Sequence, residues 1–356
     1  MHIIKNGRQM IFPEKSIEKR IIMVSKQRKR SLQVITIIIL LLGLNYYLGQ
    51  TYTIVAPGIT VDLKEIVTVE NGSKHKEGSF FLTTVSSRTL NIPLLFYAAV
   101  DPYVNIERKE QMIPAGWDMQ QYMDYMRRWM EESQKIAEVV ALRKAGYNTQ
   151  ILGDGAQVIE IMPESTAKGK LLPGDIIKKV DKEKVNLAEE VVKKVSNHNI
   201  GEMVELEVER QNKNITVLIP TMESKTEKGK SVIGIYITTL NWKPILPLKI
   251  DIDTGDIGGP SAGSMLTMEI LNQLSSENLT KGHKIAGTGT ISLDEQIGEI
   301  GGVQQKVKAA YRDGAEIFFV PERNANDAVK AAEGLNIEII SVTKLDDILD
   351  YLEELK

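Results

Sequence analysis

The chain has 356 residues, with 44 Lys or Arg against 47 Asp or Glu, so its net charge is -3 at pH 7. This balance lacks the basic excess of nucleic-acid-binding proteins and argues against a nucleic-acid partner. The absence of cysteine excludes a disulfide framework, a thiolate metal site and a cysteine nucleophile, and neither a metal nor a cofactor is expected. The length predicts roughly two or three domains, each large enough to bury a core.

The first predicted element is a single transmembrane helix at residues 31–50. Its centre, Ile35–Leu42, is almost wholly apolar, and its length suits a bilayer span. Four basic residues stand between positions 26 and 30, whereas the next basic residue after the helix is Lys64. This asymmetry predicts a cell-membrane protein in which residues 1–30 are cytoplasmic and everything after residue 50 is extracytoplasmic.

Two other interpretations of this segment stay open. A cleaved signal peptide shares the apolar run, although the run is long for one and no clear small-x-small cleavage site follows it. A buried core helix is the third possibility. The start codon is also open between Met1 and Met23, and we favour Met23 because the stretch that it begins supplies a sufficient basic flank by itself.

Residues 51–146 are predicted to hold short strands followed by one long helix. Turn residues punctuate Val55–Val100, in which Phe80–Val85 is a candidate strand. Asp118 and Gln121 form a capping-box-like helix start, and apolar residues then repeat at helical spacing. We expect the Met-rich stripe of this helix to face the core; a membrane-lying or substrate-gripping face is the alternative.

Residues 147–222 form a second predicted unit that is rich in strands. Its expected elements are the strands Gln157–Ile161, Glu205–Arg210 and Ile215–Ile219 and the helix Ala188–Val195. This order, together with the segment Leu172-Pro-Gly-Asp-Ile-Ile177, resembles a PDZ domain. The resemblance implies that an extended peptide binds beside a strand and that a loop of backbone N–H groups binds its C-terminal carboxylate.

The carboxylate-binding loop would be formed by Leu152, Gly153, Asp154 and Gly155. This sequence departs from the usual Gly-apolar-Gly-apolar form of the family. Whether the unit binds C-termini is therefore open, and a small β-rich domain that only spaces the chain is the alternative.

A charged linker, Glu223–Lys230, leads to a third predicted unit at residues 231–356. Strands and helices alternate there, which predicts an α/β or α+β fold. The expected strands are Ile285–Ile291, Glu316–Val320 and Ile337–Ser341, and the expected helices are Ala262–Leu274, Val303–Asp313, Ala325–Glu333 and Leu345–Leu355.

The segment Asp256–Ser264 holds a candidate nucleophile. Two glycines and a proline precede Ser261 and an apolar helical run follows it, which places this serine at a helix N-terminus. Unpaired backbone N–H groups and the helix dipole favour negative charge there. The hydroxyl can then attack a carbonyl while N–H groups near Gly259, Pro260 and Ala262 hold the oxyanion. An ordinary serine N-cap is the alternative.

A nucleophilic serine needs a base, and the sequence offers two kinds. Of the four histidines only His75 and His283 could plausibly reach Ser261, and His283 lies in a polar turn typical of a solvated loop. Lys306 lies on the apolar face of its predicted helix, where burial would lower its pKa by roughly three units from about 10.4. The alternative is a lysine that extends out of the apolar stripe to water.

Three segments together resemble the proteolytic domain of Lon proteases: Asp256–Gly263, Thr288–Ser292 and Gly301–Ala310. The resemblance spans residues 231–356 and implies a Ser-Lys dyad of Ser261 and Lys306, with Thr288 helping to position the lysine. The membrane helix, the PDZ-like unit and this domain together resemble the PDZ-containing Lon-like serine proteases of Gram-positive bacteria. In that family the PDZ unit is inserted into the protease fold, so we expect residues 55–110 to complete the catalytic domain.

The chain departs from the Lon pattern in two respects. Lon commonly has an acidic residue three positions before the serine, but Gly258 stands here and the nearest acid is Asp256. No Gly-x4-Gly-Lys-[Ser/Thr] phosphate loop occurs, which predicts that ATP is not used.

The predicted function is therefore ATP-independent serine endopeptidase activity outside the cytoplasm, directed at peptides or at unfolded or membrane-associated protein segments. A membrane-tethered PDZ scaffold with an inactive protease fold is the alternative. The sequence leaves open the substrate, the cleavage-site preference and whether the chain forms a homo-oligomer.

Overall fold

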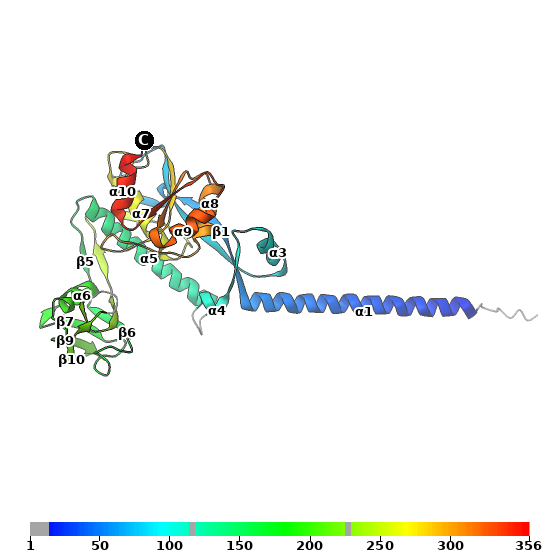
Figure 1. Ribbon diagram of the computed structural model, residues 1–356, viewed down its shortest axis with the longest axis horizontal. Coiled ribbons are helices and arrows are strands. Elements are labelled where there is room, and N and C mark those ends of the chain that lie inside the picture. Colours follow the sequence, from blue (N-terminus) through cyan, green and yellow to red (C-terminus); the bar gives the residue numbers. More distant parts are fainter. Residues whose placement is uncertain (1–13, 114–117, 225–228, 356) are drawn as a thin grey trace, which may run out of the picture.

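The computed structural model describes residues 14–113, 118–224 and 229–355. The start of the predicted cytoplasmic segment and the middle of the predicted charged linker lie outside these residues. Three parts are visible: one long helix, an α/β unit next to it, and a β-rich unit on the far side (Figure 1). The β-rich unit is residues 153–242. The α/β unit is the rest of the folded chain after the long helix, a sheet with helices on both of its faces.

The long helix α1 (Glu14–Thr51) projects away from the folded units (Figure 1). Its segment Arg28–Thr51 is 24 residues long and apolar enough to cross a membrane, and nearly all of its residues are exposed. The predicted apolar helix at residues 31–50 is thus present, and it continues through the basic residues before position 31. No linker follows, because strand β1 begins at Tyr52.

The sheet of the α/β unit combines strands from both ends of the chain. Its order is β20-β19-β16-β3-β1-β4. The bounds are β1 Tyr52–Asp62, β3 Ser79–Thr89, β4 Asn105–Arg108, β16 Lys284–Gly287, β19 Ile317–Pro321 and β20 Glu338–Val342. The parallel pairing of β16 with β3 joins the part before the β-rich unit to the part after it, with Ile285 opposite Phe80.

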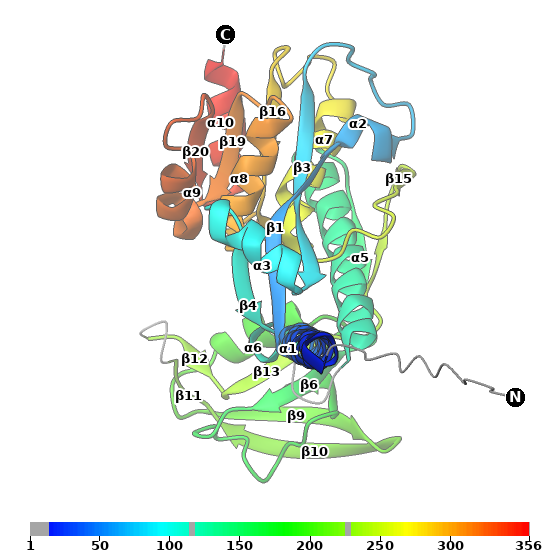
Figure 2. The ribbon, with the colours of Figure 1, turned by 90° about the vertical axis from the view of Figure 1, so that its right-hand side faces the viewer.

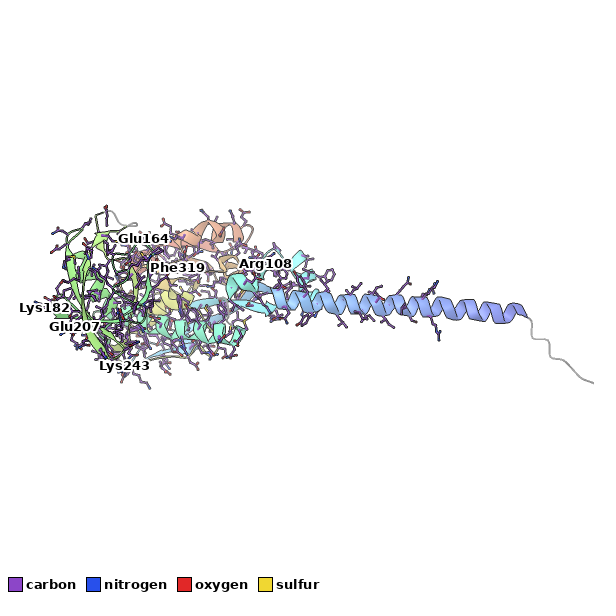
Figure 3. The ribbon with its side chains drawn as sticks, turned by 90° about the horizontal axis from the view of Figure 1, so that it is seen from below. Arg108, Glu164, Lys182, Glu207, Lys243 and Phe319 are labelled. Atoms are coloured by element: carbon purple, nitrogen blue, oxygen red, sulfur yellow. The ribbon has the colours of Figure 1, made fainter. Side chains whose placement is uncertain are left out.

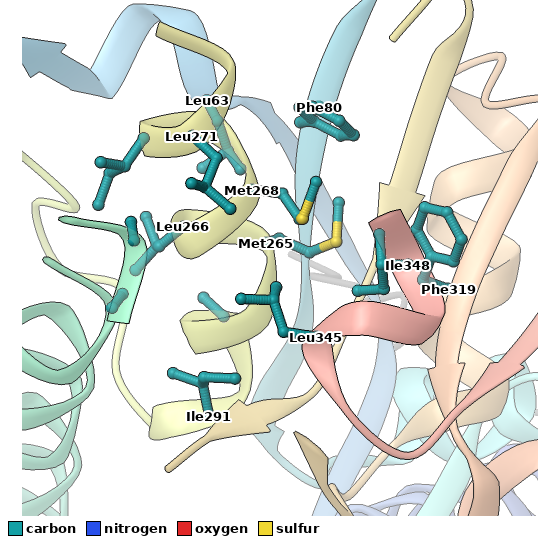
Figure 4. Packing of buried hydrophobic residues seen from close by; sticks show 14 of the residues in the cluster. Leu63, Phe80, Met265, Leu266, Met268, Leu271, Ile291, Phe319, Leu345 and Ile348 are labelled. Atoms are coloured by element: carbon teal, nitrogen blue, oxygen red, sulfur yellow. The ribbon is translucent and has the colours of Figure 1, made fainter. Parts of the chain in front are cut away.

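Helices cover both faces of this sheet. On one face lie α5 (Met119–Lys144), α7 (Gly263–Leu274) and α10 (Leu345–Glu354), packed around Phe80, Met265, Leu266 and Phe319 (Figure 4). On the other face lie α8 (Val303–Arg312) and α9 (Ala325–Ala331), packed against Phe318 and Val320. Neighbouring residues of β19 therefore point into opposite cores, as the pleat of a strand requires.

Small elements close the top of the unit: α2 (Leu63–Ile66), β2 (Val67–Val69) and β15 (Ile250–Ile252). β2 and β15 pair antiparallel, and the side chain of Gln273 on α7 bonds to the backbone of Val67 and Val69. α7 is thereby fixed between the sheet and this cover.

The β-rich unit has a five-strand path, β10-β9-β7-β6-β13, with β8 beside β7. Its bounds are β6 Ala156–Ile161, β7 Ile176–Val180, β8 Glu183–Lys184, α6 Ala188–Ser196, β9 Met203–Arg210, β10 Lys213–Pro220, β11 Met222–Glu223, β12 Ser231–Val232 and β13 Ile235–Thr239. The unit runs past the predicted end at residue 222, because β13 pairs with β6. Residues 231–239, predicted to begin the third unit, therefore belong to this one.

The chain enters and leaves the β-rich unit through one antiparallel ribbon. β5 (Gln150–Leu152) pairs with β14 (Lys243–Ile245), with Ile151 opposite Pro244. Everything from Gly153 to Trp242 is thus the loop of a hairpin, and the α/β unit is interrupted at one place only within the described residues.

Two predictions for residues 51–146 were wrong in part. Ile92–Val100, expected among short strands, is the helix α3. Asn91 caps it by accepting from the Leu94 N–H at 2.9 Å, and a short apolar run cannot be assigned from periodicity alone. The short helix α4 (Lys109–Met112) was also not predicted.

The long helix α5 begins with the predicted capping box at Asp118. Its Met-rich stripe faces the core only in part, because Met130 is buried while Met119 and Met123 are exposed. The first half of α5 extends past the edge of the core, which local periodicity does not report.

Candidate active site

Ser261 lies in a short 3-10 turn, η1 (Pro260–Ala262), that leads directly into α7. Gly259 reaches the turn with φ 93°, a left-handed conformation that favours glycine. Its N–H donates to the carbonyl of Met126 at 2.8 Å, and a Cβ at this position would meet the Met126 side chain at 2.9 Å. The first half of α5 therefore holds the loop that presents the serine.

Lys306 comes from α8, which packs on the opposite face of the sheet from α7. The helix begins after Gly302, whose left-handed φ of 68° turns the chain into it. Lys306 is only 3% exposed, as the apolar spacing of this helix predicts. A lysine held there cannot extend to water, so the predicted burial is confirmed.

The structure brings three predicted site residues into mutual contact. Lys306 Nζ donates to Ser261 Oγ at 2.8 Å and to Thr288 Oγ1 at 3.0 Å. Thr288 Oγ1 in turn donates to the Ser261 carbonyl at 3.1 Å. The Gly289 N–H donates to the same carbonyl at 2.8 Å. Hydroxyls and one backbone amide thus fix both the amine and the serine backbone.

The electrostatics of the site depend on the lack of an acidic counter-ion for Lys306 among the described residues. Its polar contacts are hydroxyl groups, and no ion pair joins it to an acidic side chain among the described residues. Burial lowers the pKa of Lys306 to about 7, because the charged form loses hydration without gaining a counter-ion. An amine with this pKa can take a proton near neutral pH.

Ser133 on α5 supports the loop and was not predicted from the sequence. Its side chain is 3% exposed, and its hydroxyl donates to the Pro260 carbonyl at 3.0 Å. Gly263 must stay small here, because a Cβ would lie 2.6 Å from Ser133 Oγ and 2.8 Å from Ile291 Cγ2. Ser133 is far from the motif in the sequence, so no local signal could have identified it.

The predicted oxyanion donors are only partly available. Pro260 has no N–H, the Gly259 N–H is bonded to Met126, and the Gly263 N–H donates to the Pro260 carbonyl. The amides of Ser261 and Ala262 remain as donors from the predicted segment. Asp256, the acid nearest the serine, is exposed and has no hydrogen bond to the site.

Neither candidate histidine accompanies Ser261. His283 Nδ1 lies 2.7 Å from Glu316 Oε2, and His75 Nε2 lies 3.1 Å from the Asn272 carbonyl. In the described part of the chain no three His, Asp or Glu side chains gather in a way that could hold a metal ion.

A second candidate site is an apolar groove of about 250 Å³ in the β-rich unit. It lies between α6, which contributes Val191, Val192 and Val195, and the segment that leads into β13, which contributes Ile233 and Ile235. β13 ends the strand path of its sheet, so its outer edge faces this groove. This groove was not predicted from the sequence, because Ser231 and the residues after it were expected to belong to another unit.

The loop predicted to bind a carboxylate, Leu152–Gly155, does not line this groove. The Asp154 N–H donates to the Leu240 carbonyl and the Gly155 N–H to the Asn186 carbonyl. These two amides are therefore already paired, and the loop serves to join β5 to the unit.

Protein families match both the α/β unit and the β-rich unit. Residues 248–354 match the Lon protease (S16) C-terminal proteolytic domain, and residues 137–221 match the PDZ domain. The chain therefore carries a Lon S16 serine protease domain, with a β-rich PDZ domain and one long apolar helix before it.

Individual relatives give the same assignment over part of their length. The Lon protease of Mycoplasma pneumoniae is 32% identical over 165 residues, which are 43% of this chain and 20% of that protein. Lon protease 2 of Bacillus subtilis is 30% identical over 173 residues, or 43% of this chain and 31% of that protein. The matched regions thus cover between a fifth and a third of these relatives.

Among solved structures, the PDZ domain of an SdrC-like protein from Listeria monocytogenes is similar to this chain. It is 24% identical, covers 24% of this chain and 87% of its own, and has a TM-score of 0.22.

Proposed function

We propose that this protein is a serine endopeptidase in which Ser261 is the nucleophile and Lys306 the base. One observation carries the proposal: a buried amine with a pKa near 7 lies 2.8 Å from the serine hydroxyl. At pH 7 about half of such an amine is neutral. A neutral amine at hydrogen-bond distance is what general-base activation of a hydroxyl requires.

The arrangement favours proton transfer in the required direction. When Lys306 is neutral, one of its N–H groups can donate to Thr288, which leaves its lone pair for the Ser261 hydroxyl. Ser261 Oγ then bonds to the scissile carbonyl carbon as its proton moves to Nζ. The resulting ammonium gives that proton to the leaving amine, and the amine departs as the acyl-enzyme forms.

Water completes the reaction by the same proton route. Lys306, neutral again, takes a proton from the attacking water as its oxygen bonds to the acyl carbon. The Lys306 ammonium then returns this proton to Ser261 Oγ as the bond between Oγ and the acyl carbon breaks, which releases the acid product. The backbone N–H groups of Ser261 and Ala262 are our proposed donors to the oxyanion in both steps.

We also propose that the reaction needs no ATP and takes place outside the cytoplasm at the cell membrane. The sequence holds no phosphate-binding loop of the Gly-x4-Gly-Lys type. The apolar segment of α1 and the basic residues before it favour an anchor with a cytoplasmic N-terminus.

The groove beside β13 supports a role for the PDZ domain in substrate binding. An extended peptide that pairs with the free edge of β13 would place alternate side chains against Val191 and Val195. We propose that this domain holds substrate segments while Ser261 cuts elsewhere in the same chain.

The test is cleavage of fluorescein-labelled casein, an unfolded protein, by the full chain in detergent without nucleotide. We expect Ser261→Ala and Lys306→Ala each to lower the rate by about 10³-fold or more, as in other serine hydrolases that lose a member of the catalytic group. His283→Ala is the matched control and keeps the wild-type rate, and Mg-ATP changes nothing.

Three results would contradict the proposal. If His283→Ala alone abolished cleavage, the histidine would be the base. If Ser261→Ala cleaved as fast as the wild type, Ser261 would not be the nucleophile. If the wild type did not cleave at all, the protease fold would be inactive and the scaffold alternative would stand.

A further inference from the structure

The helix α3 (Ile92–Val100) is apolar on all sides, yet its outer side is exposed. Its nine residues carry no charge, and the Tyr97 hydroxyl is its one polar side-chain group. None of the nine is buried; Phe96 is 69% exposed and Val100 81% exposed. A helix that is apolar all round belongs in a protein core or in lipid, and the described part of the chain supplies no cover for its outer side.

One side of α3 packs on the protein and fixes where the helix lies. Leu94, Leu95 and Ala98 contact a small cluster built on Leu48 of α1 and Ile54 of β1. Phe96 and Val100 are on the exposed side. The helix lies at the end of the α/β unit from which α1 leaves, and it lies in front of the strands of that unit when this end faces the viewer (Figures 1 and 2).

The depth of α3 relative to α1 follows from one hydrogen bond. The Ile92 N–H donates to Asn45 Oδ1 at 3.1 Å. Asn45 stands six residues before the end of α1, about 9 Å along the helix axis at 1.5 Å per residue. The start of α3 is therefore level with the last turns of the candidate span, where a bilayer changes from hydrocarbon to headgroups.

A short, bonded connection between α1 and the α/β unit fixes the position of α3 along the axis of α1. α1 runs into β1 at Tyr52 with no intervening residue. Lys109 Nζ donates to the Gly49 carbonyl at 2.6 Å and so caps the end of α1. Arg108, beside it, marks the point where α1 leaves the body, far from Lys182 and Glu207 of the β-rich unit (Figure 3).

We propose that α3 is a second membrane contact that lies in the lipid interface beside the anchor and seats the protease domain on the bilayer. The proposal rests on the proposed anchor: if α1 spans the membrane, α3 must lie at the lipid surface. The exposed rings of Tyr46, Tyr47 and Tyr97 suit that level, because tyrosine has an apolar body and a polar tip.

The absence of cysteine makes a direct depth measurement possible. Single cysteines are introduced by Phe96→Cys and Val100→Cys in the full chain, labelled with a nitroxide, and reconstituted into phosphatidylcholine–phosphatidylglycerol vesicles. Val329→Cys is the matched control, because Val329 is an exposed valine (55%) on α9 of the same unit. Leu41→Cys, within α1, reports on the anchor itself.

We expect the labels at 96 and 100 to be several-fold more accessible to oxygen, and several-fold less accessible to a water-soluble nickel chelate, than the label at 329. Lipid contact gives this combination, because oxygen concentrates in hydrocarbon and the chelate does not. The Leu41 label should show the same combination more strongly.

Three outcomes would overturn the proposal. If both α3 labels meet the chelate as readily as the label at 329 while the Leu41 label is in lipid, the anchor stands and α3 lies in water. If the α3 labels are shielded from both oxygen and chelate, a second copy or another protein covers the helix. If the Leu41 label is also in water, the anchor fails first; casein cleavage by Ser261 is tested independently of it.

Discussion

The two folded units each bury an ionisable side chain, but only the β-rich unit gives that side chain a partner of opposite charge. In the β-rich unit, Asp175 is 2% exposed and accepts two bonds from Arg210, at 2.7 and 2.6 Å, and one from the Leu172 N–H. Burial alone would raise the pKa of Asp175, but these donors outweigh it and hold the pKa below its usual value. In the α/β unit, Lys306 is buried as deeply and meets only hydroxyls, so its pKa falls toward neutrality.

The difference separates a structural charge from a reactive one. A buried charge with a full set of partners stays charged and specifies one conformation. A buried group without a counter-ion gives up its charge and becomes an acid or a base near pH 7. Glu269 on α7 behaves like Lys306: burial raises its pKa to about 7, and its Oε2 accepts no hydrogen bond from any residue that the structure describes.

Among these predictions, the largest change in free energy should come from removing Asp175, the buried partner of Arg210 in the β-rich unit. Asp175→Ala leaves Arg210 without its carboxylate and should destabilise the β-rich unit by about 3 kcal/mol. Hydrogen exchange of β7 and β9 in the full chain measures this. Glu183→Ala, which removes an exposed pair with Lys194, is the control and should change little. Unchanged exchange in Asp175→Ala would show that the buried pair is not structural.

The hydroxyls around Lys306 give the next effect. Thr288→Val keeps the shape of the side chain but removes a contact that orients the amine, and misplacement of a catalytic group on this scale costs about 10²-fold in rate, or about 2.7 kcal/mol. We expect kcat for casein cleavage to fall with little change in KM. Thr288→Ser restores the hydroxyl and should recover most of the rate; equal loss in both variants would point to packing instead.

A smaller effect, of opposite sign, is expected for stability. Lys306→Met removes a buried amine and should stabilise the α/β unit by about 2 kcal/mol at pH 7. Between pH 7 and about 10.4 the unfolded lysine holds a proton that the folded lysine lacks. Raising the pH over this range therefore stabilises the wild type and closes the gap.

Urea unfolding of the two proteins at pH 7 and pH 10 measures that gap. A Lys306→Met variant that is less stable than the wild type at pH 7 would mean that the amine is a paired, structural group like Asp175.

The smallest expected effect is the change in cleavage rate for each unit of pH. Below a pKa of about 7 the neutral fraction of Lys306 falls about tenfold for each pH unit, or about 1.4 kcal/mol. We expect kcat/KM to rise with pH up to about 7 and then to level off. A midpoint near 10 would show a solvated, charged lysine and remove the contrast with Asp175.

Local signals in the sequence indicated the two candidate residues: a 3.6-residue repeat identified the apolar face of α8, and the glycines before Ser261 indicated a turn into a helix. The pairing of Ser261 with Lys306 was predicted from the resemblance to Lon proteases. The hydrogen bond from Ser133 to Pro260 and that from Gly259 to Met126 depend on how α5 packs. No property of the single sequence reports such packing.

The errors in the fold have a related cause. β13 pairs with β6 across most of the β-rich unit, and a pairing between distant segments leaves no periodic trace in either strand. Because this pairing was not predicted, the domain boundary was placed too early, and the apolar groove beside β13 was not predicted. α3 was missed because a nine-residue apolar run fits a strand or a helix equally well.

The paired ribbon β5–β14 makes the PDZ domain a replaceable module. Because Gln150 and Ile245 face each other as neighbours in a hairpin, a two-residue Asn-Gly turn could close the ribbon just beyond Leu152 and Lys243. Every strand of the sheet β20-β19-β16-β3-β1-β4 would survive this excision, so another domain could be exchanged at one position while the proposed catalytic site stays whole.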